Sequence, residues 1–137
     1  MSEQNKATAR RIFDEVASKG NLGVISELVA SNHVYHSNPQ LSGIDGQKKM
    51  VTMYRTAFPD LELTVEDQIS EGDKVVSRIT VRGTHKGDLM GTPPTGKHVT
   101  ITAISIMRFA DNKVVEEWEL VDEAGMMQQL GVAEAPS

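Results

Sequence analysis

The chain has 137 residues, of which 24% are charged and 39% hydrophobic, and its net charge is −5. These values predict one globular domain over residues 1–137, with a core large enough to hold a pocket. The acidic balance argues against nucleic-acid binding, and the lack of cysteine excludes disulfides and thiolate chemistry. No apolar run approaches the ~20 residues that span a bilayer, and no signal peptide is visible, so we expect a cytoplasmic protein without a membrane partner.

Apolar residues at helical spacing predict three helices before the midpoint of the chain. The first covers residues 2–19 and ends at Gly20, the second covers 21–30, and the third covers 46–57. Each has one apolar stripe and an opposite polar face, which is typical of helices that cover a sheet. We expect these helices to be structural.

A short polar segment from His33 to Pro39 lies between the second and third helices, and we expect it to form a short strand. Alternation places His36 and Asn38 on one side of this segment and His33 on the other. We expect His36 and Asn38 to face a substrate and His33 to face solvent.

The second half of the chain changes to a period of two, which is typical of strands. Four strands are predicted over residues 61–69, 74–86, 99–109 and 113–121. Asp67 falls on the apolar side of the first of them, so that strand is bulged there or Asp67 lies at its rim. The third strand is apolar on both faces, which predicts a central strand that is covered on both sides.

The last strand places the only tryptophan in line with carboxylates. Alternation puts Glu116, Trp118 and Asp122 on one face, which we expect to meet the interior. A hairpin through residues 110–112 pairs Arg108 with Val114 and brings Arg108 to that same face. Arg108, Glu116 and Trp118 are therefore candidate substrate-binding residues, although Arg108 and Glu116 could also simply pair with each other.

Asp122 ends this strand and starts a short helix, so two roles are open. It could cap the helix by accepting backbone N–H bonds, or it could act as an acid or base in an apolar pocket, where its pKa would be raised. His85 lies on the apolar face of its strand, before a glycine-rich loop. It is either a core residue or a donor that faces the substrate.

Helices followed by a meander of strands predict an α+β fold, in which a long curved antiparallel sheet wraps the N-terminal helices as a cone with an interior pocket. The surplus apolar face of the central strand suggests a homodimer in which two sheets pack together.

Two motifs resemble a known family. They are the segment from Gly83 to Lys97 and the segment that contains Glu116-Glu-Trp118, Asp122 and Met127-Gln-Gln-Leu-Gly131. With Tyr35-His36 they resemble the SnoaL-like polyketide cyclases of the nuclear transport factor 2-like superfamily, over nearly the whole chain.

The resemblance implies cofactor-free ring closure of a polyketide ester by an intramolecular aldol reaction. It implies an aspartate at the position of Asp122 as general acid/base, and His85 is the second catalytic candidate. The substrate would be an apolar, carbonyl-bearing small molecule.

Two other functions stay open. A non-catalytic module could hold a hydrophobic ligand in the same cone, and a hydrolase of the limonene epoxide hydrolase type could use Arg108 and Asp122 around one water. No short ligand spacing supports a zinc site, so we expect no metal and no cofactor.

Overall fold

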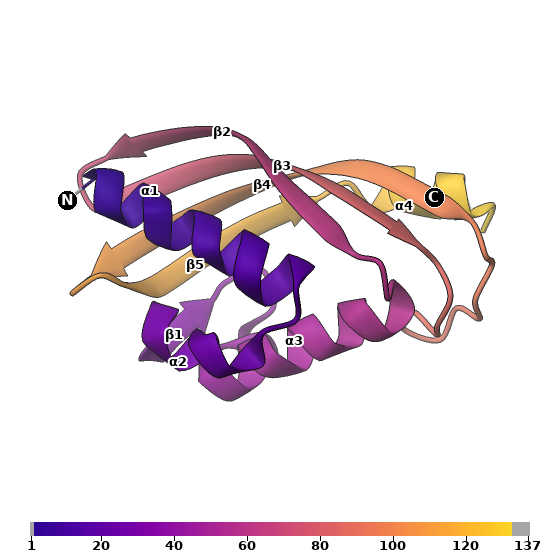
Figure 1. The fold of residues 1–137 in the computed structure, drawn as a ribbon, viewed down its shortest axis with the longest axis horizontal. Coiled ribbons are helices and arrows are strands. Elements are labelled where there is room, and N and C mark those ends of the chain that lie inside the picture. Colours follow the sequence, from indigo (N-terminus) through magenta and orange to yellow (C-terminus); the bar gives the residue numbers. More distant parts are fainter. Residues whose placement is uncertain (1, 133–137) are drawn as a thin grey trace.

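The computed structural model describes residues 2–132 and shows a curved five-stranded sheet that wraps over helices (Figure 1). The strand order is β1-β5-β4-β3-β2. This confirms the α+β architecture. The sequence predicts that the polar tail after Gly131 is frayed, and residues 133–137 of that tail lie outside the described part of the chain.

The helices are more varied than the periodicity predicts: the first two predicted helices are each divided into shorter segments, whereas the third begins three residues earlier, at Gly43. Their bounds are α1 Ser2–Arg11, a π-helix Ile12–Ser18, a 3₁₀ turn Leu22–Val24, α2 Ile25–Leu28, a 3₁₀ turn Pro39–Leu41, α3 Gly43–Ala57 and α4 Glu123–Leu130. Gly20 ends the first helical segment in a left-handed conformation, with φ of 70°. Among residues 2–132, no helix is both long and apolar enough to cross a membrane.

The four long strands form the predicted antiparallel meander. Their bounds are β2 Glu62–Glu71, β3 Lys74–Thr84, β4 His98–Ala110 and β5 Lys113–Val121. A fifth strand, β1 (Val29–Tyr35), pairs in parallel with β5. A short strand was predicted here, over residues 33–39 rather than 29–35, but its parallel pairing with β5 was not, because that partner is distant in the sequence.

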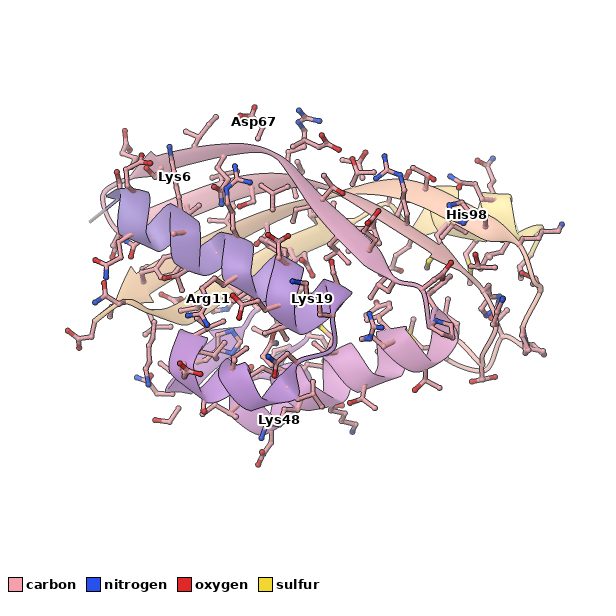
Figure 2. The ribbon with its side chains drawn as sticks, in the orientation of Figure 1. Lys6, Arg11, Lys19, Lys48, Asp67 and His98 are labelled. Carbon is pink, nitrogen blue, oxygen red and sulfur yellow. The ribbon has the colours of Figure 1, made fainter. Side chains whose placement is uncertain are left out.

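Two bulges change the phase of the sheet. The first shifts the register of β2 between Val65 and Asp67, as one of the two sequence alternatives predicts. Asp67 consequently points away from the helices, on the convex side of the sheet (Figure 2). The second bulge lies in β5, where Phe109 pairs with Val114 but Arg108 pairs with Glu116.

The β5 bulge leaves Val115 as an extra residue and inverts the alternation beyond it. Val114 is fully buried, as predicted, but the inward-facing residues after the bulge are Glu117, Glu119 and Val121 rather than Glu116, Trp118 and Asp122. The sequence prediction extended the alternation from Val114 to Asp122 without a break. Its assignment of the inner face of β5 is therefore wrong.

Helices α1 and α3 lie beneath the concave face of the sheet (Figure 1). Ala9 and Phe13 pack with Ile79 and Met107 at one end, while Phe58 packs with Val99 at the other. Buried apolar area of this kind is the main source of fold stability. The space between the two packed ends forms the cavity.

Candidate functional site

A cavity of about 110 Å³ lies between the concave face of the sheet and the helices. Most of its wall is apolar. It is lined by Ile12, Phe13, Val16, Ala17, Ile25, Val29, Gln47, Met50, Val51, Tyr54, Phe58, Leu61, Leu63, Val81, Arg82, Gly83, Val99, Ile101, Ala103, Glu117, Glu119, Val121 and Met126. Such a concave apolar site with a few polar groups is the usual form of a small-molecule pocket.

Part of this wall comes from the π-helix Ile12–Ser18, which supplies Phe13 and Val16. The hydroxyl of Ser18 fixes the end of this helix, because it accepts from the Leu63 N–H at 2.8 Å and donates to the Phe13 carbonyl at 3.0 Å. Single-turn π-helical segments are frequent at functional sites. Here the segment continues helix α1, and its Ser18 bonds it to Leu63 of strand β2.

Glu119 is the central polar group of the cavity. Its Oε1 accepts a hydrogen bond of 2.8 Å from the hydroxyl of Tyr35 on β1. Burial, followed by the negative charge of Glu117, raises the pKa of Glu119 to about 7. A carboxyl group with this pKa exchanges protons readily at neutral pH, which suits a general acid/base.

Two neutral polar residues of α3 face the same cavity. The pKa of Tyr54 is raised by burial and then by the charges of Glu119 and Glu123, so its hydroxyl stays protonated at neutral pH. Gln47 is buried and its amide donates to the Leu41 carbonyl at 2.9 Å. Tyr54 in particular can donate a hydrogen bond to an oxygen on a bound molecule.

Glu117, the second carboxylate of the wall, contacts a histidine behind it. Its Oε1 lies 3.5 Å from Nε2 of His33, and both residues are almost fully buried. The other ring nitrogen of His33, Nδ1, accepts from the Gly43 N–H at 3.0 Å. The expectation that His33 faces solvent is therefore wrong, since β1 turns it inward beside β5.

Four of the predicted site residues do meet, but on the convex face. His36 stacks on Trp118 with ring centroids 4.7 Å apart, and its Nε2 lies 2.8 Å from Glu116, which also binds Arg108. We call His36, Arg108, Glu116 and Trp118 the outer cluster. None of these four lines the cavity, so their predicted placement in it is wrong. The β5 bulge turns Glu116 and Trp118 outward, but Arg108 faces outward because Ala110 pairs with Lys113, which makes the turn two residues long rather than three. The predicted pairing of Arg108 with Val114 is wrong for the same reason. Pairing of Arg108 with Glu116 is confirmed.

Asp122 is an exposed helix cap. Its Oδ1 accepts from the Gly125 N–H at 2.9 Å at the start of α4, and its side chain is absent from the cavity wall. The capping alternative is confirmed by this contact. Whether Asp122 also takes part in catalysis stays a prediction.

His85 and Asn38 hold backbone segments rather than line the cavity. His85 is fully buried, and its Nδ1 accepts from the Thr95 N–H at 3.2 Å, which fixes the glycine-rich loop. Asn38 is exposed, and its side chain accepts from the Gln40 N–H at 3.3 Å. The core alternative is therefore confirmed for His85, and Asn38, which was predicted to face a substrate, lies outside the cavity.

The sequence analysis assigned no role to Tyr35, Glu117 or Glu119. One signal was present, because Glu117 and Glu119 sit at alternate positions of a strand that ends in apolar residues. A pair of carboxylates on one face of a strand indicates either solvent or a functional site. The bulge that turns them inward had no visible signal.

Within residues 2–132, no group of three or more His, Asp or Glu side chains is arranged to hold a metal ion. The polar residues of the cavity are instead arranged for proton exchange and hydrogen bonding.

Comparisons with known proteins agree on one family. The model of the SnoaL-like polyketide cyclase family matches residues 7–130. The chain is 30% identical over 95 residues to aklanonic acid methyl ester cyclase DnrD of Streptomyces peucetius, which is 69% of this chain and 66% of that protein. It is 26% identical over 136 residues to the aklanonic acid methyl ester cyclase DauD of Streptomyces sp. strain C5, covering 96% of this chain and 83% of that one.

Solved structures give the same result. IdmH of Streptomyces antibioticus superposes with a TM-score of 0.81 at 32% identity, over 94% of this chain and 99% of IdmH. A SnoaL-like protein of Jannaschia sp. CCS1 superposes with a TM-score of 0.85 at 29% identity, over 96% of this chain and 94% of that one.

Proposed function

The chain belongs to the SnoaL-like polyketide cyclase family, and we propose that it catalyses a cofactor-independent intramolecular aldol cyclisation of an apolar polyketide ester. The observation that carries the proposal is Glu119, a carboxyl group with a pKa near 7 in an otherwise apolar cavity. Glu119 acts as the general acid/base. The relatives named as aklanonic acid methyl ester cyclases suggest the substrate class.

The reaction needs one proton carrier and no other reactant. The Glu119 carboxylate removes a proton from a carbon next to a carbonyl group, and the electron pair moves onto the carbonyl oxygen to give an enolate. The enolate carbon then attacks a second carbonyl carbon of the same molecule and forms the C–C bond. The new alkoxide takes its proton from the Glu119 carboxylic acid, so the product is an isomer of the substrate.

Tyr35 and Tyr54 have separate roles in this scheme. Tyr35 holds one oxygen of Glu119 at 2.8 Å, which orients the carboxyl group. Tyr54 donates to the enolate oxygen, because it lines the cavity with its hydroxyl protonated. A preorganised donor of this kind stabilises developing negative charge most strongly where water is excluded.

The hydrolase alternative receives no support from this geometry. It requires Arg108 and Asp122 around one water, but Arg108 pairs with Glu116 on the convex face and Asp122 caps α4. The binding-module alternative uses the same cavity without proton transfer, so only a measurement of turnover separates it from the cyclase.

The test is to incubate the protein with aklanonic acid methyl ester and look for a cyclised product of unchanged mass by liquid chromatography and mass spectrometry. In D₂O, proton abstraction also exchanges the substrate's acidic C–H hydrogen for deuterium. We expect wild type to do both and Glu119→Gln to lose ~10²–10⁴-fold of the rate.

Asp122→Asn is the matched variant for the competing assignment. If Asp122→Asn loses turnover while Glu119→Gln keeps it, the general base is Asp122 and our assignment fails. Tight binding of the ester with neither exchange nor cyclisation by wild type would favour the binding module.

A further inference from the structure

The second carboxylate of the cavity, Glu117, has no role in the scheme above. We propose that His33 and Glu117 form a positioning pair that holds the negative charge of the two-carboxylate cavity on Glu117, so that Glu119 is the group that keeps an exchangeable proton. This inference rests on the proposed function of Glu119.

The first step is the state of the His33 ring. Because Nδ1 accepts the Gly43 N–H bond, the neutral ring carries its hydrogen on Nε2. That nitrogen is the one that faces Oε1 of Glu117 at 3.5 Å. Nε2 has no hydrogen-bond partner among the described residues, so the donor is free to close on a Glu117 carboxylate.

The second step is the choice between the two acids. Glu117 and Glu119 are two residues apart on one face of β5, and two close carboxylates in an apolar site do not ionise equally. Glu117 faces the N–H of His33, whereas Glu119 faces the hydroxyl of Tyr35. Burial, followed by the charges of Glu119 and Glu117, raises the pKa of Tyr35. Its hydroxyl therefore stays protonated and remains a donor to Glu119.

The third step concerns the other groups that face the pair. Across the sheet, Glu117 pairs with Met107 and Glu119 pairs with Ser105, which are both uncharged. From α3 the neutral Gln47 and Tyr54 line the cavity, and Arg82 of β3 is the only basic residue among the residues that line it. β1, β5 and α3 supply no basic residue to the cavity wall, and His33 of β1 lies behind that wall. The N–H of His33 is therefore the feature that distinguishes Glu117 from Glu119.

The proposal is tested by a titration that needs no substrate. In protein labelled with ¹³C at the glutamate carboxyl carbon, the NMR resonance that disappears in Glu119→Gln belongs to Glu119. We expect its midpoint near 7 in wild type. In Glu117→Gln the midpoint falls by about one pH unit or more, because the neighbouring negative charge is gone.

Glu116→Gln is the matched control, since it makes the same change one residue away on the outer face of β5. We expect the Glu119 midpoint in this variant to stay within about 0.3 pH unit of the wild-type value, because solvent screens the charge of Glu116. His33→Phe keeps a ring in place but removes the donor. There the proton is no longer confined to Glu119, and the Glu119 midpoint falls.

An unchanged or raised Glu119 midpoint in folded Glu117→Gln overturns the proposal. An unchanged Glu119 midpoint in folded His33→Phe also overturns it. Thermal unfolding shows that each variant is folded. Failure of the proposed function is separate: a fully active Glu119→Gln enzyme would refute catalysis by Glu119, whatever the titration shows.

Discussion

The two faces of strand β5 carry the same kind of side chain in opposite surroundings. Glu116 on the convex face lies between His36 and Arg108, and hydrogen bonds from His36 and then Arg108 lower its pKa. Glu119 on the concave face has no such basic partner, and burial raises its pKa. Two carboxyl groups three residues apart on one strand thus have pKa values shifted in opposite directions.

The contrast extends across the sheet. The row that contains Glu119 continues through Ser105 and Ser77 to Gln68, all on the concave side. The neighbouring convex row runs from Trp118 through Ile106 and Val76 to Ile69. The row on the concave side is polar and the row on the convex side is apolar, which is the reverse of an ordinary one-sided sheet. Within the polar row Glu119 lines the cavity, and the apolar row is the surface on which we predict that a second copy of the chain packs.

The largest expected difference between the faces is in turnover. Glu119→Met fills the same space without a carboxyl group, and we expect a loss of ~10²–10⁴-fold, the usual contribution of a general acid/base. Glu116→Met should keep the wild-type rate, because its side chain lies outside the cavity. The measurement is the rate of cyclisation for both variants under identical conditions. Equal losses in the two variants would abolish the distinction between the faces.

The pH dependence of stability should have opposite signs on the two faces. The folded-state pKa of Glu119 lies above its usual value of 4.5, so folding is favoured by the bound proton and loses stability as pH rises from about 4.5 to about 7. The loss amounts to at most about 3 kcal/mol for a shift of this size. Glu116 acts in reverse, since its lowered pKa stabilises the fold above its usual range and that contribution disappears on acidification.

Chemical denaturation of wild type and Glu119→Gln between pH 5 and pH 8 measures this effect. The free energy of unfolding of wild type should fall relative to the variant as pH rises. A difference that stays constant with pH would show that Glu119 is not perturbed in the folded protein.

The convex face offers the next prediction, the homodimer. Leu120 is 79% exposed and Ile69 is 65% exposed, and both belong to the outer side of the sheet. If two sheets pack together there, Leu120→Lys places a charge in the interface and should weaken self-association by roughly tenfold or more. Light scattering over a dilution series measures this. A monomeric wild type would count against the dimer and leave the apolar row unexplained.

The sequence predicts those parts of the fold that depend on neighbouring residues, and it predicts less well the parts that depend on pairing between distant segments. Periodicity located α1, α3 and the four long strands, because local spacing reports directly which face is buried. Arg108 and Glu116 share a face, as predicted, but it is the convex face, because the two-residue turn and the β5 bulge together turn both side chains outward. The short strand before α3 was predicted, but its parallel pairing was missed because its partner is the last strand of the chain.

The site was missed for a different reason. The position of Glu119 depends on one extra residue, Val115, and a one-residue slip exchanges the two faces of a strand. Val114 and Val115 are both apolar and both buried, so composition does not show which of them is the extra one. The resemblance placed the acid/base at Asp122, three residues beyond the carboxylate that the fold turns into the cavity.

The smallest expected effect belongs to Asp122, and it separates a cap from a catalyst. Asn accepts the same backbone bond as Asp, so Asp122→Asn should change stability by less than about 0.5 kcal/mol and leave turnover intact. Asp122→Ala removes the acceptor from the Gly125 N–H and should cost about 1 kcal/mol.

Gly125→Ala supplies an independent check, because a Cβ at Gly125 would collide with the Asp122 carboxylate and displace the cap. Thermal unfolding beside the cyclisation rate measures all three variants. Loss of turnover in Asp122→Asn with unchanged stability would return the catalytic role to Asp122 and make Glu119 a structural acid.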